Sequence, residues 1–425
     1  MMNHGKTIYG LCEELFPICR SITGEGVRQT LAILKRHLPG LKIHAVPSGT
    51  KAFDWTVPRE WNIRDAYVET PDGERIIDFK KHNLHVVGYS TPIDEWVDFE
   101  TLDRHLHSLP DQPDAIPYVT SYYREYWGFC LEHNERGQLD PAIKYHVVID
   151  SALEYGVLNY GELIIPGETE KEIFLSTYIC HPSMANNELS GPAVVTALAE
   201  WLQERPRRYT YRIIFIPETI GSIVYLSKNI DEMKKKVIAG FVVTCVGDNK
   251  TFSYLESPYA NTLADKAAQL ILQEEHPEYK RYRFLQRGSD ERQYCAPGVD
   301  LPVVSVMRSK YGEYPEYHTS LDNLDFISPE GLEGAFYVYK KIIEALEANR
   351  EYRLSCLCEP QLGKRGLFPT TSTKDSWKRI QSMMDVIAYL NGKNDLLDIA
   401  ETTGTRLSEI YSIIERLKHA NLIEE

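Results

Sequence analysis

Residues 172–182 read Glu-Ile-Phe-Leu-Ser-Thr-Tyr-Ile-Cys-His-Pro, a largely apolar run that is followed by a histidine and a proline. Runs of this length without alternation are typical of strands buried on both faces of a sheet. Further β-branched runs occur at 145–150, 212–217, 238–244 and 302–306. Helix-like segments lie between them, at 191–205, 222–235 and 261–274. The alternation predicts an α/β fold, with a mixed, mostly parallel sheet that is sandwiched by helices.

The segments on either side of this pattern predict additional parts. Residues 5–38 carry apolar side chains at helical spacing and indicate a helical pair. Short strands punctuated by Pro, Asp and Gly follow, and the stretch 108–129 is rich in Pro and aromatic residues. We therefore expect an inserted, small β-rich domain at 51–139, whose aromatic stretch is either a loop packed by its own rings or a lid over a substrate.

The C-terminal region has a different pattern, without strand-like runs. Three helices are expected at 377–390, 396–401 and 407–419, the last two joined by Thr402-Thr403-Gly404-Thr405 in the manner of a helix-turn-helix. We expect an all-α, winged-helix-like domain at 366–425, which leaves 1–50 and 140–360 as the core. The third helix mixes acidic and basic residues, whereas a DNA-binding helix is normally more basic. A packing or partner-docking module is the favoured interpretation.

Composition narrows the class of protein. The 425 residues include 43% hydrophobic and 25% charged ones, and the net charge is −14, which makes nucleic-acid binding by the whole chain unattractive. No run approaches the roughly 18 apolar residues of a membrane span, and the N-terminus lacks a signal-peptide pattern. The eight cysteines are scattered, which favours buried reduced thiols. We expect a cytoplasmic protein that does not contact a membrane, and a homo-oligomer is plausible.

Candidate site residues follow three of the apolar runs. His181 ends the first, Glu218 follows the run at 212–217, and His318 stands in Tyr317-His318-Thr319-Ser320-Leu321-Asp322. Active residues in such sheets gather beyond the carboxyl ends of the strands. One histidine after a strand is usually structural, but two histidines with Glu188 and Glu218 weaken that interpretation.

These residue types suit metal-assisted hydrolysis. Neutral imidazoles and a carboxylate hold Zn²⁺ with one position open, and the ion lowers the pKa of its bound water toward about 7. A carboxylate that does not bind the metal can then take the proton of that water. We expect His181, Glu188 and His318 to bind the metal and Glu218 to be the general base.

The ordered motifs at 181, 187–191, 218, 289–290 and 318–322 resemble those of the zinc-dependent aminopeptidases of the glutamate-carboxypeptidase-like family. A closer resemblance, over essentially the whole chain, is to a bacterial and archaeal family of aminopeptidase-like proteins of unassigned substrate, often associated with polysaccharide biosynthesis. It is carried by the segments 53–58, 83–86, 106–110, 116–123, 127–130 and 180–183. The resemblance implies a zinc-exopeptidase-like core with an inserted domain and a C-terminal winged-helix-like domain.

Departures from the aminopeptidase pattern bear on the number of metal ions. The resemblance implies two zinc ions bridged by an Asp where this chain has Asn187, and further carboxylates where it has Thr219 and Thr244. Because these ligands are missing or displaced, we expect one zinc ion per chain. Lower-ranked candidates for ligands or their hydrogen-bonding partners are Asn187, Asp248, Asp290 and Asp322.

Three functional hypotheses follow. The first is a metal-dependent, aminopeptidase-like hydrolase of amide or peptide bonds, acting on a small molecule or short peptide that Tyr122, Tyr123 and Trp127 contact. The second is a catalytically silent ligand-binding or scaffold protein on the same fold. The third is a DNA-binding regulator, against which the acidic charge and the near-neutral third helix count.

Overall fold

The computed structural model describes residues 4–367 and 374–424, with side chains omitted for 374–379. These residues form two compact units. Unit 1 comprises Met1–Ala260 and Lys280–Tyr337, and unit 2 comprises Asn261–Tyr279 and Val338–Glu425. Each unit is described by itself. No helix in the described ranges is both long and apolar enough to cross a membrane.

An eight-stranded mixed sheet forms the centre of unit 1, in the order β1-β10-β12-β11-β13-β16-β14-β15. β11 (Glu172–Tyr178), β12 (Thr210–Ile216), β13 (Val237–Val242) and β16 (Val303–Met307) run parallel to one another. Every residue of β11 is buried, as expected for a strand covered on both faces. The predicted mixed, mostly parallel sheet is confirmed.

Antiparallel pairing occurs toward both edges of this sheet. On one side β10 pairs antiparallel with both β12 and β1, and on the other β14 pairs antiparallel with β16. The bounds of the edge strands are β1 (Lys42–Pro47), β10 (Val157–Ile165), β14 (Ser253–Leu255) and β15 (Lys280–Tyr282). The four parallel strands therefore lie inside the sheet, where their carboxyl ends share one edge.

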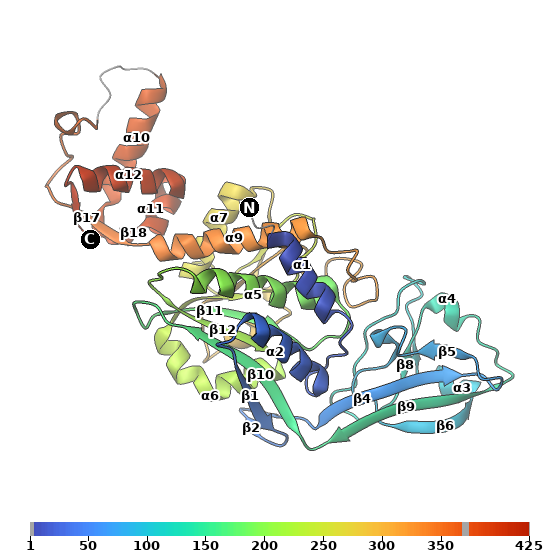
Figure 1. Ribbon diagram of the computed structural model, residues 1–425. Coiled ribbons are helices and arrows are strands. Elements are labelled where there is room, and N and C mark those ends of the chain that lie inside the picture. Colours follow the sequence, from blue (N-terminus) through green and yellow to red (C-terminus); the bar gives the residue numbers. More distant parts are fainter. Residues whose placement is uncertain (1–3, 368–373, 425) are drawn as a thin grey trace. The chain divides into compact units, whose positions relative to one another are not determined.

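Helices cover both faces of the sheet (Figure 1). The N-terminal pair and α5 contact one another, with α6 drawn on the opposite side of the strands (Figure 1). Their bounds are α1 (His4–Leu15), α2 (Glu25–His37), α5 (Ser190–Gln203), α6 (Ile220–Lys236) and α8 (Glu291–Tyr294). A further helix, α9 (Pro329–Ala348), begins in unit 1 and continues into unit 2. α5 and α6 each begin shortly after a central strand, so both loops that start them lie at the carboxyl edge.

The inserted part contains a four-stranded antiparallel sheet of order β5-β4-β9-β6. Its strands are β4 (Glu60–Glu69), β5 (Arg75–Asp78), β6 (Ile93–Asp98) and β9 (Lys144–Glu154), and β4 and β9 form a long ribbon away from the central sheet (Figure 1). Residues 145–150 were expected in the core, but they lie in β9, which pairs with β4 and β6. Its residues alternate between buried and partly exposed, which is typical of a half-covered antiparallel strand.

Short elements complete the insert. They are β2 (Lys51–Ala52), β3 (Trp55–Thr56), η1 (Asn83–His85), α3 (Phe99–Asp103), β7 (Leu106–His107), β8 (Phe129–Cys130) and α4 (His133–Arg136).

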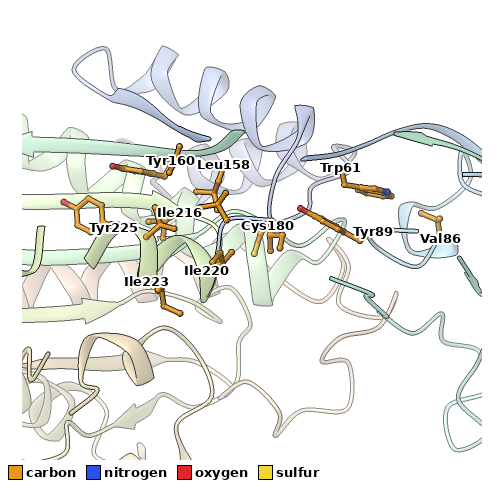
Figure 2. Close-up of a cluster of buried hydrophobic side chains, with 14 of the residues drawn as sticks. Trp61, Val86, Tyr89, Leu158, Tyr160, Cys180, Ile216, Ile220, Ile223 and Tyr225 are labelled. Atoms are coloured by element: carbon orange, nitrogen blue, oxygen red, sulfur yellow. The ribbon is translucent and has the colours of Figure 1, made fainter. Parts of the chain in front are cut away.

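One hydrophobic cluster joins the insert to the central sheet (Figure 2). Trp61 and Tyr89 of the insert belong to the same cluster as Ile216 at the end of β12, Ile220 at the start of α6, and Cys180. Burying apolar side chains from both parts stabilises their contact by roughly 25 cal/mol per Å² of apolar surface. The insert is therefore packed against the carboxyl ends of the central strands.

Unit 2 contains the helices expected near the C-terminus together with a small sheet. Its helices are α7 (Leu263–Glu275), α10 (Lys374–Tyr389), α11 (Leu396–Thr403) and α12 (Leu407–His419). A three-stranded sheet, β17 (Glu351–Leu354), β18 (Asn391–Asp395) and β19 (Ile423–Glu424), accompanies them. The domain was expected to be all-α, but it also contains this small sheet. Its first strand, β17, lies before residue 366, where the domain was expected to start.

The amino end of α12 is hydrogen-bonded to α7. The backbone N–H of Leu407 donates to Oε1 of Glu274 at 2.7 Å, and Lys266 of α7 forms an ion pair with Asp398 of α11. The first N–H groups of a helix need an acceptor, and a side chain of α7 supplies one here.

Candidate metal centre

His181 lies in the loop after β11, and hydrogen bonds hold its backbone carbonyl and one side of its ring. Nδ1 is 2.7 Å from Oε2 of Glu188, and the His181 carbonyl accepts a hydrogen bond from Nε of Arg20 at 3.0 Å. Nε2 lies 3.7 Å from Oε2 of Glu218. The side chain is buried, and burial, followed by the charge of Arg20, lowers its pKa to about 3. A neutral imidazole with its Nδ1 side occupied offers Nε2 toward Glu218.

Glu188 is fully buried in η2 (Ala185–Leu189), on the Nδ1 side of His181. Its Oε1 is 3.9 Å from Nε of Arg20. Burial raises the pKa of Glu188 to about 8, against the lowering effect of Arg20 and of backbone N–H groups at 180 and 181. The carboxyl group is therefore placed between an imidazole and a guanidinium.

Cys180 joins the same group. Potential ligand atoms of Cys180, His181 and Glu188 lie within 4.8 Å of one another. Burial and nearby carboxylates, of which Glu188 is the first, raise the pKa of the Cys180 thiol well above its ordinary value. A protonated thiol is a poor metal ligand, and a cation here would be repelled by Arg20. We regard the opposite side of the imidazole as the better place for a metal.

Glu218 follows β12 at a strained turn. The N–H of Ile220 donates to the carbonyl oxygen of Glu218 at 2.8 Å across Thr219, which has a φ of 64 and a ψ of −77. Such a γ-turn is rare, and a positive φ is an outlier for a β-branched residue. Burial, and then the charge of Asp290, raises the pKa of Glu218 to about 8. Strain of this kind is concentrated at functional sites.

Asp290 braces that turn. Its Oδ1 accepts hydrogen bonds from the N–H of Thr219 at 2.7 Å and from the hydroxyl of Ser222 at 2.8 Å. Burial raises the pKa of Asp290 to about 6. Its Oδ2 is buried and has no hydrogen-bond partner among the described residues.

His318 is the second histidine of the site. Its ring centroid is 5.3 Å from that of His181, and Tyr317 stacks on it at 3.9 Å. Burial, and then His181, lowers the pKa of His318 to about 3. In the described part of the chain, its buried Nε2 has no hydrogen-bond partner. An unpaired buried nitrogen costs free energy unless it binds something.

The insert completes the wall around the two histidines. The ring of Tyr118 lies 5.1 Å from the rings of both His181 and His318. Its N–H donates to the carbonyl of His318 at 2.9 Å, and the N–H of Ser320 donates to the carbonyl of Ile116 at 2.9 Å. The segments 116–118 and 318–320 are therefore paired through their backbones.

Of the lower-ranked candidates, the structure places two carboxylates in backbone-holding positions. Asp322 accepts from the N–H groups of Asn186 and Asn187 at 2.6 and 3.0 Å, and Asp248 accepts from the side chain of Asn186 and the N–H of Ser309. These bonds fix the loop between β11 and α5.

Asn187 and Thr244 lie together beside β11. The amide nitrogen of Asn187 donates to the hydroxyl of Tyr178 at 2.9 Å, while its buried Oδ1 has no hydrogen-bond partner within the described ranges. The Thr244 hydroxyl donates to the Asn187 carbonyl at 2.8 Å. Thr244 is therefore engaged by the backbone, whereas the amide oxygen of Asn187 is still available.

The three predicted substrate contacts have different surroundings. The Tyr122 hydroxyl is 2.8 Å from that of Tyr118, so it lies one residue away from the histidines. Tyr123 is 70% exposed. Trp127 stacks on His105 at 3.6 Å inside the insert, and its described ring contacts do not reach the histidine pair.

Two residues that surround the histidines, Arg20 and Tyr118, were not predicted as site residues from the sequence. Arg20 lies in the loop after α1 and Tyr118 in the insert, far from the histidines along the chain. The segment 116–123 was among those carrying the family resemblance, and this was the available signal for Tyr118.

Comparisons with known proteins agree with this architecture. A family model described as a domain of unknown function, DUF4910, matches residues 9–349. The chain belongs to the DUF4910 family. A second model, described as a winged helix-turn-helix, matches residues 350–425.

A relative of this DUF4910 chain comes from Clostridium acetobutylicum and is 47% identical over 422 residues, covering 99% of this chain and 96% of its own. Its name describes a polysaccharide biosynthesis protein with an aminopeptidase-like domain. A crystal structure from the same organism, described as a candidate peptidase, has a TM-score of 0.92 at 47% identity and covers 99% of this chain and 96% of its own.

The core also resembles BSAP, a zinc aminopeptidase from Bacillus subtilis, with a TM-score of 0.58 at 11% identity over 81% of this chain and 94% of that one. This likeness shows that the DUF4910 chain has the aminopeptidase-like fold, as expected from its sequence. The winged-helix part is likewise shown.

Proposed function

We propose that the protein is a metal-dependent hydrolase of amide bonds in a small molecule or short peptide, with Glu218 as the general base. The observation that carries this proposal is the group formed by the buried His181 and the half-buried His318 and Glu218. Two neutral imidazoles from different loops lie 5.3 Å apart between ring centroids. The Nε2 of one is 3.7 Å from a carboxylate oxygen, and the Nε2 of the other has no partner in the described chain.

The donor set fits one zinc ion. His181 and His318 would hold it through their Nε2 atoms, and the free amide oxygen of Asn187 is a further donor. Zinc favours imidazole nitrogen and carboxylate or carbonyl oxygen. Thr219 and Thr244 stand where the aminopeptidase pattern has carboxylates, and both hydroxyls are hydrogen-bonded inside the protein. One ion therefore fits better than two.

We assign Glu188 to positioning rather than to ligation, which differs from the expectation from sequence. It is bonded to Nδ1 of His181, and Nδ1 and Nε2 point away from opposite sides of the ring. Carboxylates in this position commonly fix the orientation of a ligating histidine. Arg20 holds Glu188 in turn.

When bound, zinc polarises a carbonyl oxygen and lowers the pKa of water toward about 7. Glu218 would accept a proton from the attacking water and pass it to the leaving nitrogen. Burial raises the pKa of Glu218 to about 8, and a nearby cation would lower this pKa toward neutral pH. Tyr118 closes the site on the insert side and limits the entry of other water.

The first test is metal content by elemental mass spectrometry, on full-length protein purified without an affinity-tag metal and then incubated with zinc. We expect about one zinc per chain in the wild type, as the two-histidine set implies. His181→Ala and His318→Ala should lose it. His419→Ala is the matched control, because His419 is an exposed histidine of α12.

Turnover is tested on a panel of small amides and peptides. Glu218→Gln should keep the zinc and lose hydrolysis by roughly 10²–10⁴-fold, the usual contribution of a general base. Full activity in that variant would remove Glu218 from this role. A wild type that takes up no zinc would contradict the hydrolase proposal and favour a ligand-binding or scaffold protein.

A further inference from the structure

Arg292 lies beside the proposed general base. It belongs to α8, and its Nη2 donates to the hydroxyl of Thr219 at 2.6 Å. Thr219 is the residue directly after Glu218, and its N–H is held by Asp290. The guanidinium is therefore tied to the same turn that presents Glu218.

The two residues before Arg292 hold its backbone in place. Asp290 is bonded to Thr219 and Ser222, and Glu291 accepts hydrogen bonds from the N–H groups of Gly288 and Ser289. Both carboxylates are buried, whereas Arg292 itself is exposed. The chain holds α8 in place and turns this side chain outward.

Among the described residues, no ion pair neutralises the charge of Arg292. A guanidinium has five N–H donors, and the one hydrogen bond found for it in the described ranges uses Nη2. Within the same ranges no carboxylate oxygen lies within 4.0 Å of its nitrogens, although other arginines of this chain, such as Arg212, are paired. The remaining donors can form the two parallel bonds that arginine makes with carboxylates and phosphates.

The positive charge acts on both walls of the site. It opposes the burial that raises the pKa of Tyr123 in the insert, and it likewise opposes the burial that raises the pKa of Tyr317 next to His318. The charge of Arg292 is therefore felt by Tyr123 of the aromatic stretch and by Tyr317, which stacks on His318. It also stands beside Thr219, where the aminopeptidase pattern would place a carboxylate and a second metal ion.

We propose that Arg292 binds an anionic group of the substrate, a carboxylate or a phosphate, next to Glu218. This inference rests on the proposed function, because it concerns the substrate of that site. A fixed cation at this position would repel the free α-ammonium group that an aminopeptidase substrate carries. The favoured substrate is therefore an amide with a negative charge near the scissile bond.

The test is isothermal titration of the zinc-incubated full chain with sodium succinate, inorganic phosphate and ethylammonium chloride. We expect one of the anions to bind and ethylammonium not to bind. Arg292→Gln should weaken anion binding at least about tenfold, and Arg292→Lys should lie between, because lysine keeps the charge but not the paired donors. The stronger of the two anions identifies the group.

Arg287→Gln is the matched control, since Arg287 is an exposed arginine that lies over Phe284 and should leave binding unchanged. Circular dichroism checks that Arg292→Gln is folded. Equal anion binding by wild type and Arg292→Gln, or no anion binding by the wild type, would overturn the inference.

Binding is measured without turnover, so the two proposals can fail separately. Anion binding that depends on Arg292, in a chain that hydrolyses no amide, supports the inference and contradicts the hydrolase. Amide hydrolysis by a chain whose anion binding is unchanged in Arg292→Gln supports the hydrolase and contradicts the inference.

Discussion

Replacing Arg20 by methionine should lower the free energy of unfolding of unit 1 by more than the loss of a surface ion pair would. Arg20 is 1% exposed, and its Nε and Nη1 donate to the carbonyls of His181 and Leu15. Its Nε is also 3.9 Å from the buried carboxyl of Glu188. Methionine fills a similar volume but leaves that carboxyl without a positive charge. Breaking a buried pair from one side typically costs about 3–5 kcal/mol.

The loss should depend on pH, and its sign follows from Glu188. Burial raises the pKa of this carboxyl from 4.5 to about 8. Between these pH values the folded chain therefore binds more protons than the unfolded chain. The free energy of unfolding should therefore fall as pH rises from about 4.5 to about 8. Arg20 limits this fall because it stabilises the ionised form. The cost of Arg20→Met should be larger at about pH 9 than at about pH 6.

Urea unfolding of the metal-free protein, followed by tryptophan fluorescence, measures these free energies. Trp61 is buried in the same unit. Arg20→Met combined with Glu188→Gln should recover about 1 kcal/mol or more relative to the sum of the single changes, because contacting residues are not additive. The control is Arg36→Met, which breaks an exposed pair with Glu14 and should cost less than about 1 kcal/mol. Strictly additive effects that do not change with pH would refute the reasoning.

Two further predictions concern other parts of the chain. Gly191→Ala would place a Cβ 2.3 Å from the carbonyl oxygen of Val243; the start of α5 must then shift, and we expect about 1–3 kcal/mol of destabilisation with weaker zinc binding in a titration. Unchanged zinc affinity would show that the start of α5 does not support the zinc site. Glu274→Ala removes the acceptor for the N–H of Leu407, which should cost about 1 kcal/mol and speed hydrogen exchange in the first turn of α12. Exchange there that stays at the wild-type rate would show that another group caps the helix.

The sequence was most informative where a residue's position follows from its own strand. His181 and Glu218 could be placed at one edge of the sheet because each follows a buried parallel strand. The assignment of 145–150 to the core failed, since a β-branched run does not say which sheet it joins. Tyr118 could not be ranked above its aromatic neighbours, because its contacts with the histidines depend on where the insert packs.

Glu188 shows a finer limit of the same kind. The sequence correctly indicated a carboxylate close to His181, but which ring nitrogen it contacts depends on the path of η2. That path is held by Asp322, which binds two consecutive backbone N–H groups of the segment. A carboxylate that contacts Nδ1 of His181 positions the ring, whereas one near Nε2 could bind the metal. The spacing of residues along the sequence does not distinguish these two arrangements.

The way the insert is attached bears on its expected role as a lid. A lid must move away from the site to admit a substrate, and its contacts with the site are then broken and remade. Here the segment 116–118 is joined by backbone hydrogen bonds to 318–320, which carries His318. The ring of Tyr118 also contacts both histidines. Lifting this segment would unpair the backbone that holds one of the proposed ligands. We therefore expect 116–118 to be a fixed wall of the site, and any movement that admits substrate to involve the exposed residues around Tyr123 instead.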